Sequence, residues 1–108
     1  MIILAIDNNT TKLEQLSSAL RSVFPGAEIL SFLNPMLAVK FAYNNTVQRV
    51  YTEVNMARMS GFDVERLIHK ANPEAKILFV TEREPQAAEG VEQWLKKPVT
   101  AEQIALVG

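Results

Sequence analysis

The stretch Ile2-Ile3-Leu4-Ala5-Ile6-Asp7 decides the fold, because five apolar residues run without interruption and stop at a carboxylate. A run of this kind is typical of a strand buried on both faces of a parallel sheet. Further segments that predict strands follow at 28–32, 47–54 and 75–80, and helical patterns separate them. The segment 47–54 is rich in β-branched and aromatic residues but includes the polar residues Gln48, Arg49 and Thr52. Strands joined by crossover helices of this length predict parallel pairing and right-handed connections. We therefore expect an α/β fold, a doubly wound three-layer sandwich.

Local signals place the helices between these runs. Thr11 and Glu14 match a capping box for the first helix. Asn34-Pro35 predicts the cap and the first residue of the second helix, and Asn72-Pro73 ends the third. The pattern is weak over 82–92, which contains Pro85 and Gly90. We expect a short fifth strand at Trp94-Leu95 and a short final helix that Thr100 and Gln103 cap.

Composition excludes several classes of function. The 108 residues carry 11 Lys+Arg and 12 Asp+Glu, a formal net charge of −1, which predicts no direct contact with nucleic acid. The absence of cysteine excludes disulfides, thiolate zinc clusters and thiol nucleophiles, and a single histidine excludes a His-rich metal site. No apolar stretch approaches the ~20 residues of a membrane helix. We expect one cytoplasmic domain spanning 1–108, with no membrane contact.

Polar residues collect where the expected strands end, and in an open α/β sheet ligands bind at those carboxyl ends. These residues are Asp7, Asn8, Glu53, Asn55, Thr81 and Lys97. If the first, third, fourth and fifth strands are near neighbours, the side chains converge on one small area. No phosphate-binding loop, dinucleotide fingerprint or nucleophile elbow accompanies them.

The chain resembles the receiver domain of two-component response regulators over nearly its whole length. Four motifs carry the resemblance in order: Ile3-Leu4-Ala5-Ile6-Asp7-Asn8-Asn9, Glu53 through Gly61, Phe79-Val80-Thr81, and Gly90 through Trp94-Leu95-Lys96-Lys97-Pro98. The resemblance implies a flavodoxin-like five-stranded sheet of order 2-1-3-4-5, here with shortened fourth and fifth helices. It also implies site roles: an acidic pair at Asp7 and Asn8, a phosphoacceptor position at Glu53, a switch hydroxyl at Thr81, a switch aromatic at Trp94, and the family's lysine at Lys97.

Two departures from the family pattern bear on chemistry. In the family an aspartate attacks phosphorus while carboxylates hold Mg²⁺. Here Glu53 stands at the acceptor position, and misplacing a nucleophile by ~1 Å can cost roughly 10²-fold in rate. Asn8 is neutral, so Asp7, Glu53 and Asn55 are expected to bind Mg²⁺ weakly or not at all. We expect no cofactor and no enzymatic activity.

Two interpretations of Glu53 stay open. Its carboxylate can stand where a phosphoryl group would lie, within reach of Lys97 and Thr81, and hold an active-like state. Alternatively, it pairs with Lys97 with no conformational consequence. Trp94 is either a signalling aromatic or an ordinary core residue, and His69 is expected on the solvated surface.

The resulting hypothesis is a non-phosphorylatable, degenerate receiver (a pseudo-receiver) that acts as a protein-interaction module. It would be the N-terminal part of a longer regulator and would control an attached or partner output, such as transcription, with a homodimer as a further partner. The alternatives are a phosphorylatable Mg²⁺-dependent receiver and a stand-alone interaction module without a signalling state.

Overall fold

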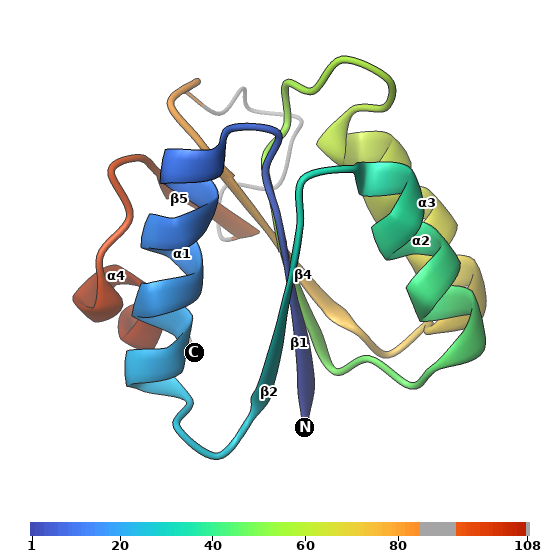
Figure 1. Ribbon diagram of the computed structural model, residues 1–108, viewed down its shortest axis with the longest axis horizontal. Coiled ribbons are helices and arrows are strands. Elements are labelled where there is room, and N and C mark those ends of the chain that lie inside the picture. Colours follow the sequence, from blue (N-terminus) through green and yellow to red (C-terminus); the bar gives the residue numbers. More distant parts are fainter. Residues whose placement is uncertain (85–92, 108) are drawn as a thin grey trace.

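The computed structural model describes residues 1–84 and 93–107 as a single sheet with helices on both faces (Figure 1). The elements are β1 (Ile2–Ile6), α1 (Thr10–Val23), β2 (Glu28–Phe32), α2 (Pro35–Asn44), β3 (Arg49–Thr52), α3 (Gly61–Ala71), β4 (Lys76–Thr81), β5 (Trp94–Lys96) and α4 (Ala101–Val107). All strand pairs are parallel and their order is β2-β1-β3-β4-β5. The predicted doubly wound sandwich and its strand order are confirmed.

Alternating residues of the strands build a core on each face of the sheet. On one face, residues such as Ile3 and Tyr51 pack against α1 and α4. On the other, Leu4, Val50 and Phe79 pack against α2 and α3. Because β1 and the Ile77–Val80 part of β4 are buried on both sides, their sequences are continuous apolar runs rather than alternating ones. β3 is equally buried at Val50 and Tyr51 but begins with Arg49 and ends with Thr52.

The helix starts follow capping chemistry, with one correction to the sequence prediction. The cap of α1 is Asn9, whose side chain accepts a hydrogen bond from the Lys12 N–H, so the capping box expected at Thr11 was wrong. Asn34 caps α2 as predicted, with Pro35 in its first turn. Thr100 caps α4, since its hydroxyl accepts from the Gln103 N–H while the Gln103 side chain accepts from the Thr100 N–H.

β3 is shorter than the segment of sequence that predicted it. The predicted segment covers 47–54, but β3 contains only Arg49–Thr52. The flanking backbone has other partners, because the Val47 N–H donates to the Asn72 side chain and the Val54 carbonyl accepts from the Gly61 N–H. The expected short final helix is present as α4, while the expected fourth helix falls on 85–92, outside the described residues.

A neutral polar network holds the end of the sheet where the strands begin. The buried Asn72 side chain accepts from the Val47 N–H at 2.9 Å and donates to the carbonyls of Ala42 at 2.7 Å and Asn45 at 3.2 Å. His69 lies beside it, half-buried, with its Nε2 2.9 Å from the Ala75 carbonyl. The expectation of a solvated His69 was therefore wrong, because a donor is needed at this carbonyl.

Across residues 1–84 and 93–107, the structure contains no helix with both the length and the apolar character that crossing a membrane requires.

Candidate functional site

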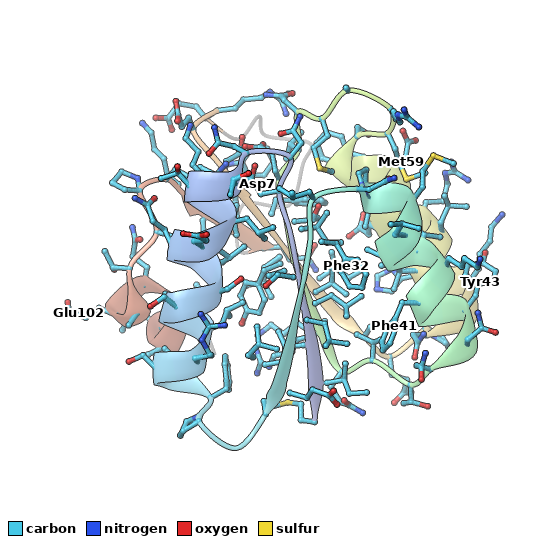
Figure 2. The ribbon with its side chains drawn as sticks, viewed as in Figure 1. Asp7, Phe32, Phe41, Tyr43, Met59 and Glu102 are labelled. Carbon is cyan, nitrogen blue, oxygen red and sulfur yellow. The ribbon has the colours of Figure 1, made fainter. Side chains whose placement is uncertain are left out.

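The carboxyl ends of four adjacent strands bring the predicted site residues together. Asp7 directly follows β1, Glu53 directly follows β3, Thr81 ends β4 and Lys97 directly follows β5. Figure 2 shows Asp7 at the end of the sheet where the strands finish. Asp7, Glu53 and Thr81 are all buried, although their positions in the sequence are 28 to 74 residues apart.

Lys97 joins the two carboxylates in one ion cluster. Its Nζ lies 2.5 Å from Asp7 Oδ2 and 2.6 Å from Glu53 Oε1. The side chains are 7%, 3% and 10% exposed for Lys97, Asp7 and Glu53, so little water screens the attraction. The expected contact between Glu53 and Lys97 is present, and the Asp7 contact makes the cluster a trio with one excess negative charge.

Glu53 is held at both carboxylate oxygens. Oε1 accepts from Lys97, while Oε2 accepts from the backbone N–H groups of Val54 at 2.5 Å and Asn55 at 3.0 Å. Burial raises the pKa of the Glu53 carboxyl, but hydrogen bonds from Lys97, from the Thr81 hydroxyl and from the Asn55 N–H outweigh burial. The pKa therefore lies below the usual glutamate value, and Glu53 is ionised at neutral pH.

The loop after Glu53 is closed by the start of α3. The Gly61 N–H donates to the Val54 carbonyl at 2.9 Å, and Ser60 and Asp63 form a capping box at the same turn. A Cβ on Gly61 would lie 2.5 Å from the Glu53 carbonyl oxygen, closer than real Cβ contacts. Glycine is therefore required here by the close approach of α3 to the backbone of Glu53.

The carboxylates of Asp7 and Glu53 are the natural candidates for metal ligands, but their oxygens already accept hydrogen bonds. The Asp7 oxygens accept from the Asn9 N–H and from Lys97, so all four oxygens of Asp7 and Glu53 already have donors. Asn8 and Asn55 are exposed. In the described part of the chain no group of three His, Cys, Asp or Glu side chains could hold a metal ion. The residues present therefore do not fit Mg²⁺, which prefers several free oxygen ligands and water.

Trp94 belongs to an aromatic cluster beside the site. Its ring centroid is 5.7 Å from that of Phe79 and 6.4 Å from that of Phe62, and the side chain is 8% exposed. The indole Nε1–H donates to the Arg83 carbonyl at 2.9 Å, just beyond Thr81. The Trp94 side chain is thus packed in the core, and its role as a switch aromatic stays a prediction.

Two further ion pairs lie at this end of the sheet and were not predicted from the sequence. Lys12 of α1 pairs with Glu82, and Lys96 pairs with Glu84. A groove of about 390 Å³ at this end of the sheet is lined by Lys12, Gln15, Glu82, Lys96, Lys97 and Pro98. The available signal was Glu82 and Glu84 within three residues of Thr81, because residues that follow β4 lie at the same edge of the sheet as Lys97.

The sheet order and the covering helices define a doubly wound α/β domain, with a buried lysine between two carboxylates at the carboxyl ends of its strands. The family model "Response regulator receiver domain" matches residues 3–107. The chain therefore belongs to the response regulator receiver domain family, and the resemblance stated from its motifs is confirmed.

Solved structures agree with this assignment of the fold. A response regulator receiver domain protein of Clostridium thermocellum is 26% identical, with a TM-score of 0.78 over 98% of this chain and 89% of that one. Chemotaxis protein CheY4 of Vibrio cholerae is 22% identical, with a TM-score of 0.81 over 95% and 91%. A Burkholderia pseudomallei response regulator with a phosphorylated aspartic acid and a calcium ion is 22% identical, with a TM-score of 0.82 over 98% and 65%. A search of curated proteins found no match.

Proposed function

We propose that this receiver domain is not phosphorylated at position 53 and works as a protein-interaction module of a signalling protein. The observation that carries the proposal is the Glu53 carboxylate, whose two oxygens accept hydrogen bonds from Lys97 and from two backbone N–H groups. A nucleophilic oxygen needs a free lone pair directed at phosphorus. An oxygen that accepts a charged hydrogen bond at 2.6 Å is a poor nucleophile.

The state of the domain follows from the same contacts. Lys97 and the Asn55 N–H donate to Glu53, and hydrogen bonding by Thr81 also lowers the pKa of Glu53. The resemblance places Lys97 and Thr81 at the family's lysine and switch hydroxyl. We infer that the carboxylate stands in permanently for a phosphoryl group and holds the domain in an active-like state. The competing interpretation is that the cluster only neutralises buried charge.

The output of the domain is the second part of the proposal. Receiver domains act on partner or attached output domains. This chain covers 65% of the Burkholderia response regulator, so that protein is longer than the match. We propose that residues 1–108 form the N-terminal, cytoplasmic part of a longer regulator, whose output, such as transcription, another domain performs. This domain itself would be non-enzymatic and, with its net charge of −1, would not contact nucleic acid directly.

Phosphotransfer is the direct test. The domain is incubated with Mg²⁺ and acetyl phosphate and analysed by intact mass spectrometry, and we expect no stoichiometric gain of a phosphoryl group. The double variant Glu53→Asp with Asn8→Asp restores the shorter nucleophile and the second acid, and it should gain the phosphoryl group. Asn8→Asp alone is the matched control, since it adds the charge without moving the nucleophile.

A stoichiometric phosphoryl group on Glu53 of the natural sequence would overturn the proposal and favour the phosphorylatable, Mg²⁺-dependent receiver. If neither the natural sequence nor the double variant reacts, the glutamate at position 53 does not by itself explain the lack of phosphorylation. To separate the active-like state from simple neutralisation, chemical shifts of Thr81 and Trp94 are compared between the natural sequence and Glu53→Gln. Shifts confined to contacts of Glu53 would support neutralisation alone.

A further inference from the structure

The edge of the sheet formed by β2 is open to pairing with another strand. Among the described residues, β2 is the terminal strand of the sheet and pairs with β1 alone. The Glu28 N–H and the Phe32 carbonyl bond to the β1 side. Because backbone groups alternate along a strand, Ile29 and Ser31 direct their N–H and C=O groups away from the sheet. β2 carries neither lysine nor proline, the residues that commonly protect such an edge.

A groove of about 450 Å³ follows this edge between α1 and α2. The view in Figure 1 shows β2 running between the two helices. Phe32 is half-buried and packs against Phe41 (Figure 2), with ring centroids 6.0 Å apart, and it also lines the groove. Leu33 and Leu37 line the groove as well, with 49% and 54% of their surfaces exposed. The edge therefore offers unpaired backbone groups beside exposed apolar side chains.

Two opposite charges line the α1 side of this groove. Glu14 and Arg21 are seven residues apart, about 10.5 Å along the helix, and both are exposed. Within residues 1–84 and 93–107 neither side chain has an ion-pair partner, whereas Lys12 and Lys96 each have one. Between them lies Ser17, whose hydroxyl is 2.6 Å from that of Ser31 on β2.

An acid and a base placed on either side of a central point make a self-complementary surface. In a two-fold interface each residue i meets residue j while j meets i. We propose that the occupant of this groove is a second copy of the chain, joined antiparallel along β2 to make one continuous ten-stranded sheet. A two-fold axis near Ser31 places Glu14 beside the partner subunit's Arg21, and Arg21 beside the partner subunit's Glu14.

A foreign extended peptide would satisfy the backbone groups of Ile29 and Ser31 equally well. It would pair both Glu14 and Arg21 only if it carried a base and an acid at the same spacing, which a second copy of this chain supplies by symmetry. The second copy satisfies both charges, both strand edges and the exposed leucines with the same operation. The reciprocal charge pattern therefore favours self-association over an unrelated strand.

Charge exchange tests the pairing directly. Analytical ultracentrifugation over a range of concentrations should show the 12.1 kDa chain reaching twice its mass. Arg21→Glu and Glu14→Arg should each weaken association at least about tenfold, because each creates two like-charge contacts. An equimolar mixture of the two variants should associate again, since an all-acidic surface then meets an all-basic one. The double variant should also associate.

Matched controls change the same amount of charge elsewhere. Lys70→Glu and Glu74→Arg alter exposed residues at the end of α3, and they should leave association unchanged. Amide hydrogen exchange of Ile29 and Ser31 should slow as concentration rises. A chain that stays monomeric at millimolar concentration overturns the proposal, as does a dimer that survives Arg21→Glu. The proposal is also overturned if the two single variants stay monomeric when mixed. It is overturned too if the amide hydrogen-exchange rate of Ile29 does not change with protein concentration.

Discussion

Buried polar groups lie at both ends of the sheet, and they are neutral at one end and charged at the other. Where the strands begin, Asn72 uses both ends of a neutral amide to bind three backbone groups. Where the strands end, Lys97 is shared by two carboxylates. The first network has no net charge, while the second keeps one excess negative charge.

The difference separates a structural site from a responsive one. The bonds of Asn72 to Val47, Ala42 and Asn45 join α2 and the end of α3 to the start of β3, and none of these four amide groups titrates. A buried cluster with unbalanced charge changes its energy whenever a proton, a cation or a substituted side chain alters that balance. The function of this family is therefore expected at the charged end, and the four predictions below test the contrast.

The largest effect is expected from Lys97→Met. This change leaves Asp7 and Glu53 buried, close together and without their shared cation, and we expect a loss of about 3–5 kcal/mol in the free energy of unfolding. Urea unfolding measures it. Adding Glu53→Gln should recover part of the loss, and adding Asp7→Asn as well should recover most of it, because both uncompensated charges are then gone.

The cycle of Lys97→Met and Glu53→Gln also decides whether the two side chains interact in solution. A coupling energy of zero would mean that Glu53 does not bind Lys97, and the interpretation of Glu53 as a stand-in for a phosphoryl group would fall with it.

A smaller loss, about 2–3 kcal/mol, is expected from Asn72→Ala, which leaves the Val47 N–H and the Ala42 carbonyl without partners. This loss should be the same at pH 5 and pH 8. For Asn72→Asp, the loss in the free energy of unfolding should instead be largest at neutral pH and become smaller as the pH falls. The reason is that a protonated acid can again donate a hydrogen bond to a carbonyl. Thermal unfolding across pH checks both, and a pH-dependent Asn72→Ala would break the contrast between the two ends.

Acid should weaken the charged end through Glu53. Its pKa is lowered in the folded state, because the bonds from Lys97, Thr81 and Asn55 outweigh burial. The contribution of Glu53 is thus complete above its unfolded pKa of about 4.3 and disappears as the pH falls through the lower folded value. The stability difference between the natural sequence and Glu53→Gln should therefore be largest near pH 6–7 and shrink towards pH 3. Glu74→Gln, at an exposed position, should show no such trend.

The smallest response is expected from Mg²⁺. Because each oxygen of Asp7 and Glu53 already accepts a hydrogen bond, binding should be about millimolar or weaker. A titration followed by Trp94 fluorescence would show it, with the Asn8→Asp variant as the tighter-binding comparison. Saturation at micromolar Mg²⁺ would require a rearrangement that frees these oxygens.

The fold was predictable because β1 and β4 are buried on both faces and are therefore almost entirely apolar, while β3 was indicated by its β-branched and aromatic residues. The same reasoning placed Asp7, Glu53, Thr81 and Lys97 at one edge, since the carboxyl ends of parallel strands meet there. Trp94 was placed on the fifth strand, and its burial agrees with one of its two interpretations.

Other features depended on contacts that no local pattern encodes. Asn72 was recognised as the end of a helix, but its bonds to Val47 and Ala42 join residues 25 and 30 positions away. His69 has an unremarkable place in its helix, and only the position of the Ala75 carbonyl explains its burial. The choice of Asn9 over Thr11 as a cap depends on where the chain leaves β1, which propensity alone does not determine.

The contact between Gly61 and the backbone of Glu53 has a mechanical consequence. With 2.5 Å between the carbonyl of Glu53 and the place of a side chain at position 61, not even a methyl group fits between α3 and the strand end. The hydrogen bond from Gly61 to Val54 joins the same two segments. Together they hold the start of α3 against the backbone that follows β3. We therefore expect a change at the carboxylate to alter the side chains of Lys97 and Thr81, towards β4 and β5, more than the position of α3.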